Sequence, residues 1–225
     1  MGEVAATATP LTREQTAQQF LAAYRAAFGT DPDLNRAELL LALVWIENAN
    51  GAAIIRNNWG NLASSGTSGD YWRPGWFDLE AVEAMPEGSK KSRYLDLHGR
   101  MLAGQAPSAF SAWSSQETGA RKWLELLQKP GMRQVLDAAS SGDAERFARA
   151  IHASRYCPDP ECLRAGPSYA RARDQIRAAG YFAGLKKKVQ AVAELPGLWF
   201  YCWGRALSRR TSGHDGRAVA VAGEP

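Results

Sequence analysis

Apolar residues recur at helical spacing in the N-terminal part of the chain. Residues 12–28 begin with a capping-box pattern and carry an apolar stripe that ends at Gly29, so they predict a first helix. A second helix is predicted from Asn35 to about Gly51. Its residues 39–46 are all apolar, which is typical of a helix that is buried on every side. The pattern predicts a helical domain built around this second helix.

The same spacing returns in the C-terminal half. A capping-box pattern at Ser114 and Glu117 opens a helix that ends before Pro130. This helix is predicted to carry a buried stripe at helical spacing, formed by Ala120, Trp123, Leu124 and Leu127. Further amphipathic helices are predicted over residues 132–139, 144–154 and 169–179. A Cys-Pro-Asp-Pro turn separates the last two of these helices. The chain is therefore expected to be mainly α.

Residues 57–107 interrupt the helical pattern. Glycines and prolines recur throughout this stretch and break any long periodicity. We expect a loop-rich lobe of mixed structure, with a short helix near residues 79–85 and a few strand pairs. The predicted fold class is mainly α, a helical domain with an inserted loop-rich lobe.

The chain is expected to contain one domain with flanking segments. Residues 1–10 are predicted to be flexible, 11–182 to form the domain, and 208–225 to be disordered. Residues 183–207 form a basic and aromatic extension, with a helix predicted at 186–194. Exposed aromatic side chains generally mark a contact surface, so this extension is predicted either to pack on the domain or to dock on a partner protein.

Composition and charge agree with one ordinary globular domain. The 225 residues are 45% hydrophobic, and no apolar stretch approaches the roughly 20 residues that span a bilayer as a helix. The net charge of +4 favours a polyanionic partner, such as nucleic acid, an anionic membrane face or an acidic cell wall, and selects none of them. Because the sequence has no recognisable groove-reading motif, we expect no nucleic-acid partner.

The start of the chain and its cysteines bear on the compartment. The N-terminal residues lack the basic start and apolar run of a Sec signal, so we expect the protein to be made in the cytoplasm. Cys157 and Cys162 are close enough in sequence for a local disulfide, whereas the missing signal favours reduced thiols. A zinc site of these two cysteines with His152 lacks a fourth ligand. No metal site and no cofactor are expected.

One carboxylate occupies an unusual place. Glu47 follows the apolar run of the most buried helix and lies in the last turn of that helix. Burial and the negative end of the helix dipole both favour the neutral carboxyl, so we expect its pKa to be raised. A carboxyl that stays protonated near neutral pH is what a general acid needs in glycosidic cleavage. The alternative is a side chain that faces solvent at a fraying helix end.

Three separated motifs resemble one enzyme family. Residues 41–51, at the end of the second helix, and the Asn-Asn-Trp-Gly-Asn-Leu segment at 57–62 resemble those of lysozyme-like peptidoglycan hydrolases, most closely bacterial endo-β-N-acetylglucosaminidases. Residues 107–113 and the helix start after them are similar to the family's aromatic strand and following helix. Residues 143–160 are similar to its late helix and Gly-Tyr-x-x-Asp-Pro turn. The resemblance spans residues 11–182.

This resemblance implies an α+β lysozyme-like fold in which the loop-rich lobe forms a substrate cleft with the helical domain. It implies cleavage of a β-1,4 glycosidic bond in the glycan strands of peptidoglycan, with Glu47 as the catalytic acid. Tyr156 would face the same cleft and steady the sugar. Asn58 and Asn61 would shape the floor of the cleft.

Aromatic residues in and beside the lobe are further candidates for binding sugar. Trp72 and Trp76 belong to a cluster whose rings could stack on pyranose rings, or could form a small apolar core that holds the lobe together. Trp59 could lie in the cleft wall or in the core of the domain. Phe110, in the segment that resembles the family's aromatic strand, is also predicted to bind substrate.

A second catalytic carboxylate does not stand out in the sequence. Glycosidases usually pair two carboxylates at a defined separation. The lobe contains several candidates, none marked by its context: Asp70, Asp78, Glu80, Glu83, Glu87 and Asp96. This favours a scheme with one carboxylate, in which the N-acetyl group of the substrate attacks the anomeric carbon or an internal hydroxyl replaces water. Both routes stay open.

The main hypothesis is an endo-β-N-acetylglucosaminidase that acts on the cell wall or in the periplasm. It would be delivered by lysis, a virion or a secretion machine, as a phage lysin or an injected effector is. The C-terminal extension would dock on a phage-tail or secretion-particle protein. A lytic transglycosylase or a muramidase on the same fold is one alternative, and a non-catalytic wall-binding or particle-assembly component is another.

Overall fold

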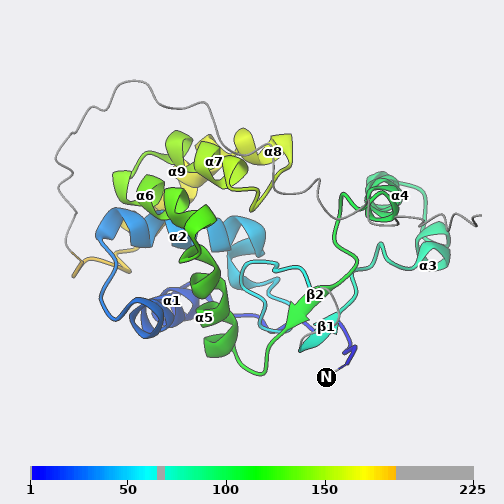
Figure 1. Cartoon of the computed structure of the whole chain (residues 1–225), viewed down its shortest axis with the longest axis horizontal. Helices are drawn as coiled ribbons and strands as arrows, with labels where there is room; N and C mark the ends of the chain where they lie inside the picture. The colour runs from blue at the N-terminus through cyan, green and yellow to red at the C-terminus, as the bar shows by residue number, and fades with distance from the viewer. Residues whose placement is uncertain (1, 65–68, 186–225) are drawn as a thin grey trace, which may run out of the picture. The chain divides into compact units, whose positions relative to one another are not determined.

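Helix α2 (Leu34–Glu47) is the central helix of the domain, and every residue from 37 to 45 is buried. In the computed structural model, which describes residues 2–64 and 69–185, α6 (Arg133–Ser141) and α9 (Gly166–Ala178) pack on α2, and α1 (Arg13–Phe28) also contacts it (Figure 1). Neighbours on several sides remove nearly the whole circumference of α2 from water, which explains the apolar run at residues 39–45. The predicted buried helix is confirmed.

The remaining helices of the domain follow the predicted order. Helix α5 (Gln116–Leu127) packs on α1, and α7 (Ala144–Ala153) packs on α6 and α9. The short helices η2 (Pro130–Met132) and α8 (Pro160–Leu163) lie between them in the chain. Apolar side chains of these long helices form one core. The mainly α fold class is confirmed.

Two helix starts differ from those predicted. Asp33, rather than Asn35, caps α2 and accepts a backbone hydrogen bond from its first turn. Ser115, rather than Ser114, caps α5. Two polar residues close together in the sequence can each cap the same helix, and the sequence alone places the helix start only to within one or two residues. Contacts with the rest of the fold select the residue that caps it. The Asn35 side chain donates instead to the Ser140 carbonyl, at 3.2 Å.

The loop-rich lobe contains more helix than the sequence predicts. Strands β1 (Asp70–Trp72) and β2 (Phe110–Ala112) pair antiparallel, and between them in the chain lie α3 (Leu79–Glu83), near the predicted short helix, and α4 (Ser89–Leu102). The short helix η1 (Ala49–Gly51) leads from α2 into the lobe. No residue of α4 is fully buried. Its half-buried residues Tyr94, Leu97 and Met101 recur at helical spacing, so α4 carries a narrow apolar stripe, which the many glycines and prolines of this region outweigh in the prediction.

The N-terminal residues run alongside the lobe, where a flexible segment was expected for residues 1–10. The Val4 amide donates to the Tyr71 carbonyl at 2.8 Å, and the Thr9 amide donates to the Ile54 carbonyl at 2.7 Å. Figure 1 shows the start of the chain beside β1. Backbone hydrogen bonds of this kind hold the segment in an extended path.

The predictions for the C-terminal part fall almost wholly outside the described residues. They concern the extension at 183–207, of which 183–185 are described, its helix at 186–194 and the tail at 208–225. In the part of the chain that the structure describes, no helix is long and apolar enough to cross a membrane.

Candidate active site

Glu47 is the last residue of α2, and the backbone that follows it is fixed by a buried side chain. Asn48 donates from Nδ2 to the Val44 carbonyl at 3.1 Å and to the Trp59 carbonyl at 2.6 Å. These bonds connect the end of the helix to the segment that begins the lobe. Glu47 is half-buried at this junction.

Asn58 closes a tight loop that carries Gly60. Its buried side chain accepts a hydrogen bond from the Leu62 amide at 2.8 Å and donates to the Leu62 carbonyl at 3.0 Å. Trp59 is also buried, and its Nε1 donates to Gln116 Oε1 on α5 at 2.7 Å. The loop therefore presents the Gly60 carbonyl in a defined position.

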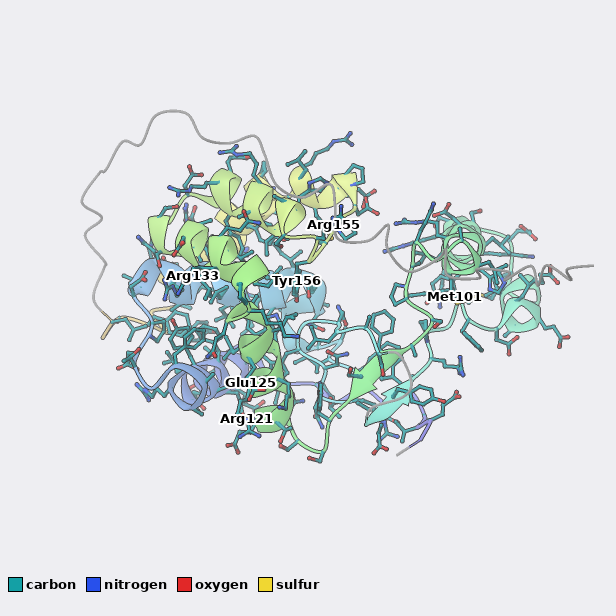
Figure 2. The ribbon with its side chains drawn as sticks, viewed as in Figure 1. Met101, Arg121, Glu125, Arg133, Arg155 and Tyr156 are labelled. Atoms are coloured by element: carbon teal, nitrogen blue, oxygen red, sulfur yellow. A yellow bond between two sulfur atoms is a disulfide. The ribbon has the colours of Figure 1, made fainter. Side chains whose placement is uncertain are left out.

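Segments that lie far apart in the sequence meet at the Tyr156 hydroxyl. This oxygen lies 3.2 Å from Glu47 Oε2 and 3.0 Å from the Gly60 carbonyl oxygen, and it accepts a hydrogen bond from Trp123 Nε1 at 2.9 Å. Tyr156 follows α7, whereas Trp123 belongs to α5, and Figure 2 shows Tyr156 near α2 and α5. The hydroxyl joins Glu47, at the end of α2, to α5 of the helical domain and to the loop that begins the lobe.

Burial governs the ionisation of Glu47. Loss of hydration raises the pKa of its carboxyl from 4.5 to about 8, and the hydrogen bond from Tyr156 opposes this rise. Burial, followed by the charge of Glu47, raises the pKa of Tyr156 well above its ordinary value of 10.0. The predicted increase in the Glu47 pKa is confirmed. Near pH 7 the carboxyl therefore holds its proton.

The other carboxylates of the lobe do not share this environment. All the candidates taken from the sequence are exposed, namely Asp70, Asp78, Glu80, Glu83, Glu87 and Asp96. Among the described residues, the Glu47 pKa reflects burial and Tyr156, and no second carboxylate contributes to it. Within residues 2–64 and 69–185, no group of His, Cys, Asp and Glu side chains is arranged to hold a metal ion.

The aromatic side chains of the lobe pack on one another. Trp72 and Phe110 stack with ring centroids 4.8 Å apart, and Trp76 meets Phe110 edge-on at 6.0 Å. Trp72 is 6% exposed and Phe110 is 7% exposed, whereas Trp76 is half-buried. Trp72 and Phe110 therefore form a small core of the lobe, which is one of the two alternatives that the sequence left open, and Trp76 keeps some accessible surface.

The other predicted sugar-binding residues divide into two groups. Asn58 and Trp59 are 0% exposed, so they support the loop around Gly60 and have no surface to offer a substrate. Asn61 is exposed and adopts a positive φ of 46° at the end of the same loop. Of this loop's three candidates, Asn61 is the one that a sugar can reach.

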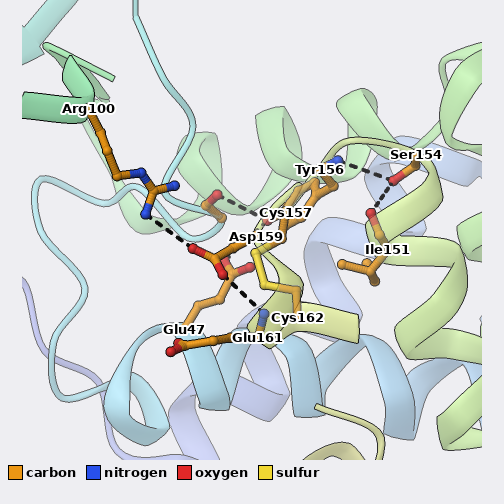
Figure 3. Close-up of a disulfide and its surroundings, with 10 residues drawn as sticks. Glu47, Arg100, Ile151, Ser154, Tyr156, Cys157, Asp159, Glu161 and Cys162 are labelled. Carbon is orange, nitrogen blue, oxygen red and sulfur yellow. Dashed lines mark hydrogen bonds and ion pairs between the residues drawn. A yellow bond between two sulfur atoms is a disulfide. The ribbon is translucent and has the colours of Figure 1, made fainter. Parts of the chain in front are cut away.

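The turn after Tyr156 is held from two sides (Figure 3). Cys157 and Cys162 form a disulfide, which is one of the two alternatives that the sequence left open. Asp159 caps α8 and pairs with Arg100 of α4 at 3.3 Å. The ion pair connects the lobe to the turn that carries Tyr156.

The sequence does not identify two members of this network. Trp123 is expected from helical spacing as part of a buried stripe, and the stripe is confirmed, since Trp123 is 0% exposed. Spacing does not reveal the partner of its indole N–H, which lies 33 positions away. A Cβ on Gly60 would overlap the Trp123 ring and the Tyr156 hydroxyl, so the close approach requires glycine.

Comparison with known proteins gives a similar solved structure. No family model and no curated protein matches the sequence. The crystal structure of a peptidoglycan hydrolase mutant from Sphingomonas sp. A1 is similar, with 19% sequence identity and a TM-score of 0.46, over 75% of this chain and 95% of that chain. Because identity and TM-score are this low, the functional assignment depends on the side chains of the site.

Proposed function

We propose that this protein is a peptidoglycan hydrolase that cleaves a β-1,4 glycosidic bond of the bacterial cell-wall glycan, with Glu47 as its general acid. One observation carries the proposal: burial raises the pKa of the Glu47 carboxyl to about 8, and this carboxyl lies 3.2 Å from the Tyr156 hydroxyl. The oxygen of the leaving sugar must receive a proton when the bond breaks, and a carboxyl that is neutral near pH 7 supplies it. The motifs that resemble those of wall glucosaminidases support the substrate class.

The proton transfer leaves a carboxylate that needs support. As the bond between the anomeric carbon and the glycosidic oxygen breaks, the proton moves from Glu47 to that oxygen and the negative charge stays on Glu47. The Tyr156 hydroxyl lies 3.2 Å from Oε2 and can donate to this charge. Hydrogen bonds to a charged acceptor are stronger than those between neutral groups, so the support grows as the charge develops.

We assign the attack on the anomeric carbon to the substrate itself. Among the described residues, no second carboxylate shifts the pKa of Glu47. The oxygen of the N-acetyl group can attack the anomeric carbon as the glycosidic bond breaks, and water then opens the cyclic intermediate. For an endo-β-N-acetylglucosaminidase the attacked sugar is N-acetylglucosamine, which becomes the reducing end of the product.

A lytic transglycosylase is the second candidate, because it needs the same single acid. In that reaction an internal hydroxyl of the muramic sugar replaces water and leaves an anhydro product. A muramidase leaves a reducing muramic end. In a non-catalytic wall-binding or particle-assembly component, by contrast, a half-buried carboxyl with a raised pKa at this junction would have no role. Delivery by a phage or secretion particle, with the C-terminal extension as docking element, stays a prediction of the sequence.

The test is mass spectrometry of purified peptidoglycan digested by the wild type, by Glu47→Gln and by Glu80→Gln. Glu47→Gln is nearly isosteric and removes the proton donor. Glu80 is an exposed carboxylate in α3 and provides the matched control. We expect reducing N-acetylglucosamine ends from the wild type and from Glu80→Gln, and none from Glu47→Gln.

Other products would change the assignment in defined ways. Anhydro-muramic ends would establish a transglycosylase, and reducing muramic ends a muramidase. Circular dichroism of Glu47→Gln checks that its loss of activity is not a loss of folding. If the wild type releases nothing from several wall types, the proposed activity is wrong and a non-catalytic role takes its place.

A further inference from the structure

The Tyr156 hydroxyl has more acceptors around it than it has protons. A hydroxyl donates one hydrogen bond and accepts two. Trp123 Nε1 can only donate to it, whereas the Gly60 carbonyl can only accept from it. Glu47 Oε2 accepts a proton when the carboxyl is ionised and donates one when it carries the carboxyl proton. The state of Glu47 therefore decides where the tyrosine proton points.

With neutral Glu47 and no substrate bound, every group is satisfied when Tyr156 donates to the Gly60 carbonyl at 3.0 Å and the Glu47 carboxyl proton points at the hydroxyl. The two lone pairs of the hydroxyl then face the Trp123 N–H and the Glu47 carboxyl. When substrate binds, this carboxyl proton turns from the hydroxyl to the glycosidic oxygen that receives it. When Glu47 is ionised, a charge-assisted bond to Oε2 is stronger than a bond to a carbonyl, so the tyrosine proton turns to Glu47. The change needs rotation of one O–H bond and no movement of heavier atoms.

We propose that Trp123 is a positioning residue that makes the Tyr156 hydroxyl a two-position donor, directed to Gly60 while Glu47 holds its proton and to Glu47 once that proton has passed to the substrate. The inference rests on the proposed function, since the second position matters only when Glu47 acts as an acid. Trp123 is 0% exposed, so it does not touch the substrate. It acts through Tyr156.

The indole N–H of Trp123 contributes in two ways. It occupies one lone pair of the phenol oxygen at 2.9 Å, so the tyrosine proton is left with Gly60 and Glu47 as acceptors. It also polarises the hydroxyl, because a hydrogen bond received by an O–H group strengthens the bond that the group gives. Burial raises the pKa of Tyr156, and the hydrogen bond from Trp123 works against that rise, as this polarisation requires.

The arrangement favours the transition state over the ground state. While Glu47 is neutral, the Tyr156 hydroxyl donates its hydrogen bond to Gly60 and stabilises Glu47 little. As negative charge develops on Glu47, the hydroxyl donates a full hydrogen bond to the carboxylate. Gly60 is the fixed alternative acceptor, held in place by the loop that Asn58 closes. The network therefore supports proton transfer out of Glu47 without keeping the carboxyl ionised beforehand.

The test compares Trp123→Phe with Trp45→Phe in wall-cleavage assays across pH. Both remove a buried indole, but Trp45 Nε1 has no hydrogen-bond partner among the described residues. Activity that needs protonated Glu47 is lost as pH rises through its pKa, so the basic limb of the profile reports this group. Tyr169 of α9 also interacts with Glu47 and Tyr156, but burial and the charge of Glu47 raise its pKa above the ordinary 10.0, so it stays protonated across this limb. In Trp123→Phe we expect kcat to fall roughly 3- to 10-fold and the basic limb to move to higher pH, because the carboxylate is less stabilised. Trp45→Phe is expected to keep the wild-type limb.

Tyr156→Phe separates this coupling from packing. It is expected to move the basic limb in the same direction as Trp123→Phe. Adding Trp123→Phe to it should move the limb no further, because Trp123 acts through the Tyr156 hydroxyl. An unchanged limb in Trp123→Phe, or effects that add in the double variant, would mean that Trp123 only packs the core, and the proposal would be overturned.

A measurement on the wild-type chain decides the question if Trp123→Phe does not fold. We expect the indole N–H resonance of Trp123 to shift as Glu47 titrates, with a midpoint of about 8, and to lose this shift in Glu47→Gln. The indole of Trp59 donates to Gln116 and provides the control resonance. A Trp123 resonance that does not follow the titration overturns the proposal. Since this measurement needs no cleavage, it stands apart from any failure of the proposed activity.

Discussion

The Tyr156 hydroxyl lies 3.2 Å from Glu47 Oε2, although the two residues are 109 positions apart in the sequence. Glu47 ends the most buried helix of the domain, and Tyr156 precedes a turn that a disulfide closes. The packing that buries α2 raises the pKa of the acid. The turn after α7 places the Tyr156 hydroxyl within hydrogen-bond distance of this carboxyl. The chemistry of the site therefore depends on how distant segments pack.

Gly60 is predicted to tolerate no side chain. In Gly60→Ala the added methyl would overlap the Trp123 ring and the Tyr156 hydroxyl. We expect the free energy of unfolding to fall by about 1–3 kcal/mol, as is typical of overpacking, and cleavage to fall because Tyr156 is displaced. Gly99→Ala, in α4, is the control, since a Cβ there meets nothing within 4 Å. Equal stability of the two variants in urea unfolding would contradict the packing around Gly60.

The raised pKa of Glu47 predicts that stability falls as pH rises. The carboxyl titrates at about 8 in the folded chain and at 4.5 when exposed, so between these values the folded chain holds a proton that the unfolded chain has lost. The free energy of unfolding should therefore decrease across this range, by on the order of a few kcal/mol from this group, and level off above it.

Urea unfolding of the wild type and of Glu47→Gln at a series of pH values measures this effect. Glutamine does not titrate, so the variant should lack the decrease that Glu47 causes. The same pH dependence in both proteins would assign the effect to other groups and would contradict the raised pKa of Glu47.

The disulfide is predicted to hold the turn that positions Tyr156. Cys157 directly follows Tyr156, and its disulfide partner Cys162 lies 5 positions further along the chain. Replacing both by serine removes a short closed loop, for which chain entropy predicts a loss of about 2 kcal/mol in unfolding free energy. Cleavage should fall as well, because the hydroxyl is held less firmly. Equal stability and activity of the wild type and the double serine variant would mean that Asp159 and Arg100 suffice to hold the turn.

Features that depend on one apolar segment could be predicted from the sequence. The buried stretch of α2 follows from consecutive apolar residues, and the raised pKa of Glu47 follows from its place at the end of that stretch. The stripe that contains Trp123 follows from helical spacing in the same way. In each of these cases, the residues that the local pattern marks as apolar are the ones that tertiary packing buries.

Features that depend on contacts between distant segments could not be predicted. The indole of Trp123 finds its acceptor on Tyr156, and Trp72 finds a stacking partner in Phe110, through packing that no local period encodes. The extended path of the N-terminal residues depends on backbone bonds, which are independent of side-chain type.

The most direct test of the central claim is the pKa of Glu47 itself, measured from the carbon-13 resonance of its side-chain carboxyl and compared with the pH dependence of wall cleavage. The resonance is identified by its absence in Glu47→Gln. We expect a midpoint of about 8, and activity that is lost as pH rises through the same value, because the acid then lacks its proton. A midpoint near 4.5, the value of an exposed carboxyl, would contradict the claim, since Glu47 would be ionised at neutral pH and could not protonate the leaving sugar.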